Sequence, residues 1–258
     1  MCRMAAYLGP PIRLDQFLLR PPHNLVEQSH NPRELNYARL NADGYGIGWY
    51  PADGLPAAYV NPMPIWSEPN LPHLARSLTS DLWVANIRSA TPGFPVDYSN
   101  TQPFHDDTLL FMHNGFVRGF RSQLRPILQG FLNPGVHAEI RGCTDSEFLF
   151  ALLRHALSEE SLSLEEAIGF VFDRLEDWAP ETPAMLNLVV SSGQTLYAAR
   201  HAMNEACPSL YYTVDDEAFP GGQLVASERL TDAEYWSAVP EHSILILGPE
   251  QPPELHSL

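Results

Sequence analysis

The sequence contains no lysine, so all fifteen of its basic residues are arginine. This absence excludes chemistry that needs a side-chain amine, namely Schiff-base catalysis, a lysine-linked cofactor and a P-loop nucleotide site. Cysteine is also scarce. Its three positions, Cys2, Cys143 and Cys207, are too few and too scattered for a disulfide framework or a CxxC metal site. A reducing cytoplasm is therefore the expected compartment.

Long apolar runs are missing as well. No stretch approaches the roughly 18 consecutive apolar residues of a membrane helix. The first ten residues show no apolar segment behind a charged start, so no secretory signal is expected. The ten histidines form no HExxH motif and no other paired ligand spacing, and we therefore expect no metal and no cofactor.

Positive charge is rare in the second part of the chain. Residues 1–138 carry ten acidic residues and ten arginines, whereas residues 139–258 carry twenty-one acidic residues and five arginines, which gives the whole net charge of −16. A nucleic-acid-binding protein would show the opposite sign, and an anionic membrane would repel this chain. We interpret the acidic part as a solubilising surface and expect a small-molecule substrate.

The residues that are present fit one domain over 1–258. The apolar fraction is 45%, which is enough for a sizeable core. Short segments rich in β-branched and aromatic residues, bounded by Gly, Pro, Asp or Asn, predict strands. These segments are 2–8, 45–50, 82–88, 108–113, 185–191, 195–200, 210–214, 223–227 and 243–247. We expect 51–72 to be an ordered loop with a short strand.

Two long helices are predicted between the two groups of strands. Thr144 followed by Glu147 has the pattern of a capping box at a helix start, and Ser163 opens the next helix. Shorter helices fit 14–20, 71–79 and 121–129, and the residues 192–194 predict a hairpin turn. The order of strands, two helices and further strands favours an α+β layered domain over a doubly wound βαβ array.

Cys2 is the first candidate for chemistry. Removal of the initiator methionine would give a chain that begins with a thiol next to a free α-amine. An α-amine has an ordinary pKa of about 7.7–8.0, so a useful fraction is neutral near pH 7 and can take the thiol proton. An incidental cysteine at position two would look the same in the sequence.

Three further segments offer binding groups. Arg88, at the end of a predicted strand, can hold a carboxylate through two parallel hydrogen bonds, although a surface arginine needs no such role. Asn114-Gly115 is first of all a turn signal, but an amide next to a glycine N–H also makes a good oxyanion hole. Asp145, at the start of a predicted helix, serves as part of the cap or binds a ligand ammonium.

Together these motifs resemble the class II glutamine amidotransferases, a branch of the N-terminal-nucleophile hydrolases, from Cys2 to about Glu228. The matching pieces are the N-terminal Met-Cys-Arg, Arg-Ser-Ala-Thr at 88–91, His-Asn-Gly at 113–115 and Thr-Asp-Ser-Glu at 144–147. The resemblance implies a four-layer αββα sandwich. It also implies the following roles: Cys2 as nucleophile with its α-amine as base, Asn114 and the Gly115 N–H as oxyanion hole, Arg88 with help from Thr91 for the α-carboxylate, and Asp145 for the α-ammonium of a glutamyl group.

The chain departs from the large biosynthetic members of this family. Ser89 and Pro92 stand where those enzymes have tryptophan and histidine, and we expect no synthetase domain after the glutaminase-sized region. The segments Cys2-Arg3, 7–10, 21–23, 28–29 and 41–50 look like the stand-alone branch typified by the ergothioneine-pathway enzyme EgtC. That enzyme hydrolyses the γ-glutamyl amide of γ-glutamyl-hercynylcysteine sulfoxide.

The resemblance therefore implies hydrolysis of a γ-glutamyl amide, in glutamine or in a γ-glutamyl metabolite, through a thioester on Cys2. The alternative is a glutaminase subunit that supplies ammonia to a separate synthetase partner, and an acidic interaction protein without catalysis is a third possibility. The loops 24–40 and 51–72 are expected to meet the leaving group. Whether the chain forms a homo-oligomer stays open.

Overall fold

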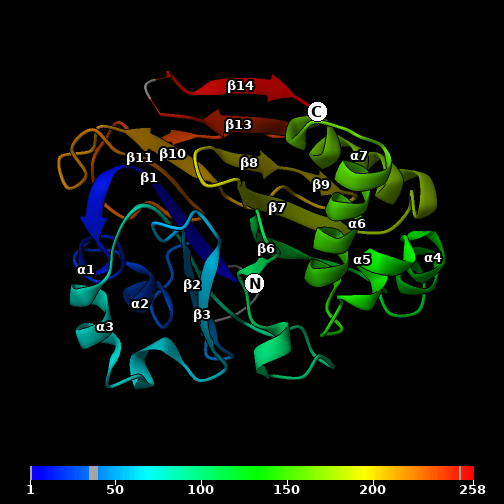
Figure 1. Cartoon of the computed structure of the whole chain (residues 1–258), viewed down its shortest axis with the longest axis horizontal. Coiled ribbons are helices and arrows are strands. Elements are labelled where there is room, and N and C mark those ends of the chain that lie inside the picture. Colours follow the sequence, from blue (N-terminus) through cyan, green and yellow to red (C-terminus); the bar gives the residue numbers. More distant parts are fainter. Residues whose placement is uncertain (1, 35–39, 250) are drawn as a thin grey trace.

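The computed structural model describes residues 2–34, 40–249 and 251–258, and within them two seven-stranded antiparallel sheets lie face to face (Figure 1). The first sheet has the order β12-β10-β11-β1-β4-β2-β3. Its strands are β1 (Arg3–Arg13), β2 (Tyr45–Trp49), β3 (Ala57–Asn61), β4 (Thr79–Ile87), β10 (Tyr211–Val214), β11 (Gln223–Ala226) and β12 (Ser237–Ala238). The second sheet has the order β14-β13-β8-β7-β6-β5, with β9 also paired to β7. Its strands are β5 (Phe104–His105), β6 (Leu110–Val117), β7 (Ala184–Ser191), β8 (Leu196–Arg200), β9 (Ala202–Met203), β13 (Ser243–Leu247) and β14 (Glu254–Ser257).

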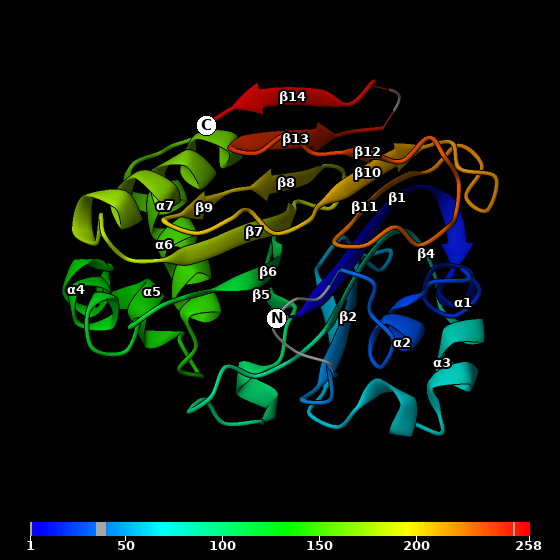
Figure 2. The same ribbon diagram turned by 180° about the vertical axis from the view of Figure 1, so that it is seen from behind.

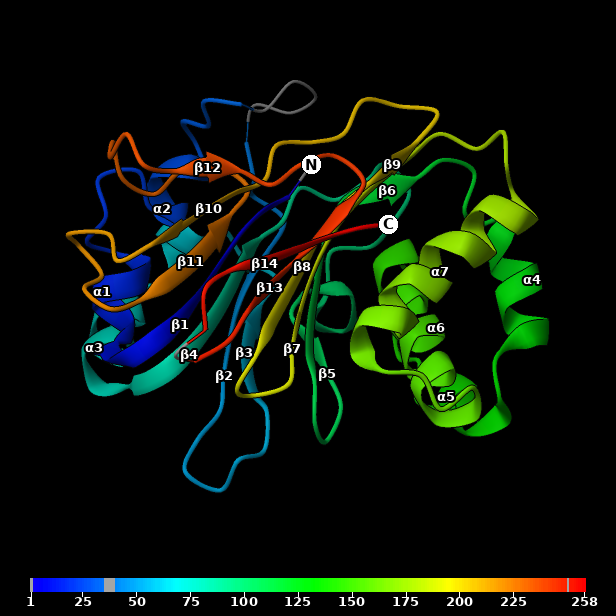
Figure 3. The same ribbon diagram turned by 90° about the horizontal axis from the view of Figure 1, so that it is seen from above.

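Helices cover the outer face of each sheet (Figures 1 and 3). The first sheet carries α1 (Leu14–Leu18), α2 (Leu25–Gln28) and α3 (Leu71–Ser77). The second sheet carries α4 (Leu124–Phe131), α5 (Pro134–Ala138), α6 (Asp145–Glu159) and α7 (Leu164–Trp178). None of the helices in the described part of the chain is long and apolar enough to cross a membrane.

Three hydrophobic clusters hold these four layers together. Along β1, Ala5 and Tyr7 pack toward the helices, whereas Met4, Ala6 and Leu8 pack toward the second sheet. This alternation follows from the two-residue period of a strand, which sends successive side chains to opposite faces. The third cluster joins the outer face of the second sheet to α4–α7. The predicted α+β, αββα sandwich is therefore confirmed.

The predicted elements agree with the structure except at short or edge segments. Every predicted strand and each of the five predicted helices is present, and β3 is the short strand expected within 51–72. The 192–194 turn joins β7 to β8 as a hairpin. The strands β5, β9, β12 and β14 and the helices α2 and α5 were not predicted.

The capping box at α6 is only half formed, so that prediction was partly wrong. Thr144 Oγ1 accepts a hydrogen bond from the Glu147 N–H at 3.3 Å, as a helix N-cap should. The Glu147 carboxylate, however, accepts from the backbone N–H groups of Arg141 and Gly142, both at 2.7 Å. Glu147 thus holds the incoming loop and not the cap residue. Burial raises its pKa even though these two N–H groups favour the charged form.

Candidate active site

Cys2 directly precedes β1, whose first residues lie near the end of β6 (Figures 2 and 3). Continuing the alternation of β1 by two residues from Met4 places the Cys2 side chain on the face toward the second sheet, and only 7% of the residue is exposed. Ser227 fixes this end of β1: its Oγ accepts from the Met4 N–H at 3.0 Å, and its own N–H donates to the Met4 carbonyl at 2.9 Å. The cysteine is thus held on an ordered strand.

Asn114 and Gly115 lie at the opposite side of the space between the sheets, near the end of β6. Leu110 and Met112 of the same strand face the first sheet, so Asn114 does too, and it is completely buried. Among the described residues, neither atom of its amide group has a hydrogen-bond partner. Gly115 has no room for a side chain, because a Cβ would lie 1.8 Å from the Met185 carbonyl oxygen.

His113 points to the other face of β6, away from the space that Cys2 faces. Its Nε2 lies 2.9 Å from the Met185 carbonyl and its Nδ1 lies 2.9 Å from Ser146 Oγ. Because a carbonyl only accepts, Nε2 carries the proton and Nδ1 accepts from the serine hydroxyl. Burial lowers the pKa of His113, which keeps the ring neutral. The residue joins β6 and β7 to the start of α6 and is not oriented to serve Cys2 as a base.

Asp145 occupies the first turn of α6 and is held against the end of β6. One carboxylate oxygen accepts from the Val117 N–H at 2.8 Å, and the other accepts from the Ser146 N–H at 2.8 Å. Asp145 is 6% exposed. Val117 lines the cavity described below, so the carboxylate lies directly behind its wall.

Arg88 follows β4 and is enclosed by the loop that comes after it. Nη1 and Nη2 both donate to the Pro95 carbonyl at 3.1 Å, so the guanidinium already holds one acceptor as a fork. The Asp43 carboxylate accepts from the Ala90 N–H at 2.8 Å and steadies the same loop. Arg88 does not itself line the cavity, whereas Thr91 does.

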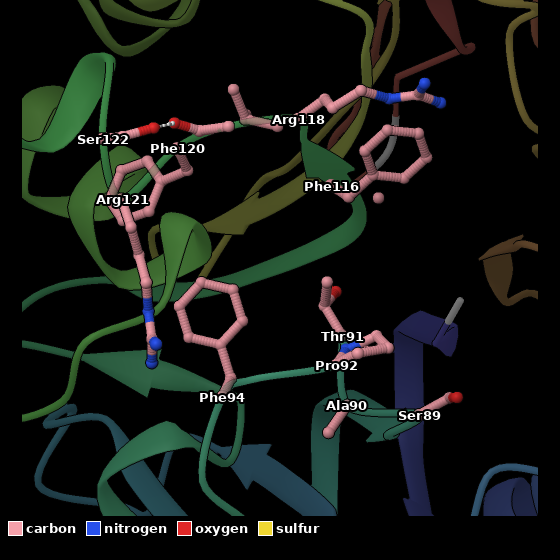
Figure 4. A pocket seen from close by; sticks show the side chains of 13 residues that line it. Ser89, Ala90, Thr91, Pro92, Phe94, Phe116, Arg118, Phe120, Arg121 and Ser122 are labelled. Atoms are coloured by element: carbon pink, nitrogen blue, oxygen red, sulfur yellow. Dashed lines mark hydrogen bonds between the residues drawn. The ribbon is translucent and has the colours of Figure 1, made fainter.

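The cavity has a volume of about 480 Å³ and lies between the loop after β4 and the turn after β6 (Figure 4). Its walls are residues 89–92, Phe94 and 115–122. Arg121 lies beside Phe94, with its guanidinium 4.6 Å from the ring centre, while Arg118 extends over Phe116 in the other direction. Of the predicted residues, Thr91 and Gly115 therefore line one cavity.

The sequence did not single out the aromatic and arginine side chains of this cavity. The signal was present as the run Phe116-Val117-Arg118-Gly119-Phe120-Arg121 directly after the Asn-Gly pair. This run does not by itself indicate a cavity wall, because only the turn after β6 brings these residues opposite Phe94.

A buried charge network lies beside Cys2 on the outer face of the first sheet. Arg3 Nε is 2.9 Å from Glu228 Oε1, and His23 Nε2 is 2.8 Å from Glu228 Oε2. The same carboxylate accepts from the backbone N–H groups of Arg33 and Glu34 at 2.8 and 3.0 Å. Burial opposes the charge of Glu228, but these hydrogen bonds and Arg3 outweigh it, so its pKa is lowered. Of the expected leaving-group loop 24–40, residues 35–39 lie outside the described residues.

Among the described residues, one cluster with the spacing of metal ligands lies away from this cavity. One donor atom each of Cys207, Glu241 and His242 lies within 4.8 Å of the others. Glu241 also lies 3.4 Å from Arg200, and His242 faces His201 at 3.0 Å. Glu241 and His242 thus already have protein partners, and none of the three residues lines the cavity.

The fold is the four-layer αββα sandwich of the N-terminal-nucleophile hydrolases. The chain belongs to the class II glutamine amidotransferases, because the sequence model of that family matches residues 31–220.

The probable glutamine amidotransferase DUG3 of Saccharomyces cerevisiae is 31% identical, over 96% of this chain and 82% of its own. The γ-glutamyl-hercynylcysteine sulfoxide hydrolase of Mycolicibacterium smegmatis is 28% identical over 95% of both chains. The structure of a glutamine aminotransferase class-II domain protein from Silicibacter pomeroyi matches with a TM-score of 0.72 and 28% identity, over 99% of this chain and 98% of that one. The protein is therefore an enzyme of this family, and the resemblance to its stand-alone branch is confirmed.

Proposed function

We propose that the protein hydrolyses a γ-glutamyl amide through a γ-glutamyl thioester on Cys2. The observation that carries this proposal is the buried Asn114 amide. It has no partner among the described residues and lies across the inter-sheet space from the face that holds Cys2. A buried amide without a partner costs about 1–3 kcal/mol, and a ligand that accepts from Asn114 would offset this cost.

The chemistry starts once the α-amine of Cys2 is free. The amine takes the thiol proton, and the thiolate attacks the γ-carbonyl carbon of the substrate. Negative charge develops on the carbonyl oxygen, where an Asn114 Nδ2–H and the Gly115 N–H would donate to it. The protonated amine then gives its proton to the leaving nitrogen, and the C–N bond breaks to leave the thioester. Attack by water releases glutamate and restores the thiol.

The glutamyl end is proposed to bind at the other predicted residues. Arg88 would hold the α-carboxylate, with the Thr91 hydroxyl beside it, and Asp145 would bind the α-ammonium. The Pro95 carbonyl now receives both Arg88 nitrogens, so a substrate carboxylate would take its place as acceptor. We propose that the loop of residues 89–95 shifts when substrate binds.

The leaving half is proposed to be larger than ammonia. A cavity of about 480 Å³ with Phe94, Phe116 and Phe120 in its walls exceeds what a glutamyl group alone fills. We propose a γ-glutamyl metabolite such as the one in the name of the Mycolicibacterium smegmatis relative, because it would fill more of this cavity than glutamine would. We also propose that residues 1–258 act as one glutaminase-type domain in the cytoplasm without a cofactor.

Intact-mass analysis of active protein tests the mechanism directly. We expect the active form to begin at Cys2, and activity in protein that retains Met1 or carries an acetyl group would contradict the role of the amine. Cys2→Ala should abolish turnover while Cys143→Ser, at a half-exposed cysteine outside the cavity lining, should not. Cys2→Ser should retain little activity, because a hydroxyl is a much poorer nucleophile than a thiol near neutral pH.

A further inference from the structure

A second buried asparagine lies next to Asn114. In the pairing of β6 with β7, Asn187 is the residue directly opposite Asn114. Val189, two residues further along β7, faces the first sheet, so Asn187 faces it as well. Both asparagines are completely buried. Side chains directly opposite on one face of an antiparallel pair have their Cβ atoms about 4.5–5.5 Å apart, so the two amides are neighbours.

The orientation of the Asn187 amide is fixed by its contacts. Its Nδ2 donates to the Ser209 carbonyl at 3.0 Å and lies 3.5 Å from the Pro208 carbonyl. Both neighbours are carbonyl oxygens that only accept, so the NH₂ end must face them. The oxygen end, Oδ1, is therefore turned away from this segment, and it has no partner among the described residues.

The same segment connects Asn187 to the strand of the nucleophile. Ser209 Oγ donates to the Ser227 carbonyl at 2.7 Å. Ser227 in turn holds the Met4 backbone at the start of β1. A chain of hydrogen bonds thus runs from Asn187 on the second sheet to the start of β1 on the first.

We propose that Asn187 is a positioning residue for the oxyanion hole. Its Oδ1 accepts one Nδ2–H of Asn114 when substrate is bound, which leaves the second Nδ2–H to face the carbonyl oxygen attacked by Cys2. Without this acceptor the Asn114 amide is free to turn its own oxygen toward the developing negative charge. The proposal rests on the oxyanion role of Asn114 stated above.

Kinetics of four variants on L-glutamine and on γ-glutamyl-p-nitroanilide test this inference: Asn187→Ala, Asn114→Ala, the double variant and Ser191→Ala. We expect Asn187→Ala to lower kcat by about 10–100-fold, the scale of a small misplacement at a catalytic group, with little change in KM. Because Asn187 acts through Asn114, the double variant should be no slower than Asn114→Ala alone.

Ser191→Ala is the matched control, since Ser191 is a buried polar residue at the far end of the same strand. It should keep normal kcat. If Asn187→Ala fails to fold, Asn187→Leu replaces it, because leucine fills a similar space but offers no acceptor to Asn114.

Three results would overturn the inference: normal kcat in Asn187→Ala, losses that multiply in the double variant, or an equal loss in Ser191→Ala. If kcat falls in Asn114→Ala but is normal in Asn187→Ala, the positioning role of Asn187 is wrong and the oxyanion role of Asn114 stands. A normal kcat in Asn114→Ala removes the proposed oxyanion role itself, and the positioning role with it.

Discussion

Asn114 is either an oxyanion donor or only a structural residue of β6, and the two roles predict different kinetics for its variants. As an oxyanion donor it matters more in the tetrahedral state than in bound substrate, so Asn114→Ala should lower kcat by about 10²–10³-fold with little change in KM. Asn114→Asp should be no better, because it places negative charge where negative charge develops. Steady-state kinetics together with a melting curve check this. If Asn114→Asp kept most of its activity at unchanged Tm, Asn114 would be only a β6 residue before Gly115.

We expect substrate binding by Arg88 to depend on the shape of the guanidinium as much as on its charge. Both terminal nitrogens already donate to one carbonyl oxygen, and a lysine ammonium cannot reproduce that planar fork. Arg88→Lys should therefore raise KM for γ-glutamyl substrates nearly as much as Arg88→Ala does. Arg76→Lys, at the exposed end of α3, is the control and should change nothing. A KM near normal in Arg88→Lys would mean that a point charge suffices.

At the residue scale, the sequence predicts candidate site residues only where they belong to a short local motif. Cys2, Asn114 and Asp145 belong to such motifs, and their neighbours in the chain suggest their chemistry. Asn187 and Glu228 are not in such motifs. Asn187 gains its significance from strand pairing with a residue 73 positions away, and Glu228 from contacts to Arg3 and His23 more than 200 positions away. Such contacts are decided by the tertiary fold.

At the element scale, the strands with strong alternation were predictable and the weak edge strands were not. β5, β9 and β12 have two residues each, too few for any periodicity to show. β1 continues to Arg13 through Pro10 and Pro11, which the sequence argues against, because proline cannot donate to a sheet. The β1–β4 register shifts between Leu8 and Ile12, so the prolines fall within this irregularity.

Glu228 joins the start of β1 to His23 and to the backbone of Arg33 and Glu34, and it should make stability depend on pH in the acidic range. Its folded pKa lies below the ordinary 4.5, so the unfolded chain binds its proton more readily. Its contribution is therefore complete above about pH 4.5 and is lost as the pH falls through the folded pKa. Glu228→Gln should flatten the dependence of unfolding free energy on pH in that acidic range. At pH 7 it should cost about 3–5 kcal/mol, because Arg3 is left buried without a counter-charge.

Urea unfolding of the wild type and of Glu228→Gln between pH 3 and pH 7 measures how their unfolding free energies depend on pH. Asp15→Asn is the control, since Asp15 pairs with Arg13 and Arg20 on the surface and exposed pairs contribute at most about 1 kcal/mol. Equal pH slopes for wild type and Glu228→Gln would show that the buried network does not set acid stability.

At the scale of the whole molecule, the layered packing brings the site together from distant parts of the chain. The two sheets share one inner core, and β1 from the start of the chain lies between β11 and β4. The acidic second part of the chain supplies α6, α7 and most of the second sheet, and it also supplies β10, β11 and β12 of the first sheet. The amidotransferase fold was predictable because the order of motifs spans the chain, whereas the cavity shape was not.

The size of the preferred leaving group separates hydrolysis of a γ-glutamyl metabolite from ammonia supply. Glutamine would leave most of the aromatic cavity unfilled, whereas a bulky amide would bury apolar surface there. Burial of some 55 Å² at about 25 cal/mol per Å² is worth about tenfold in kcat/KM. We therefore expect γ-glutamyl-p-nitroanilide to exceed γ-glutamylmethylamide and glutamine by at least about tenfold. Phe116→Ala should narrow that ratio, while Phe170→Ala on α7, away from the cavity, should leave it unchanged. A preference for glutamine that Phe116→Ala does not alter would favour a glutaminase that serves a separate synthetase.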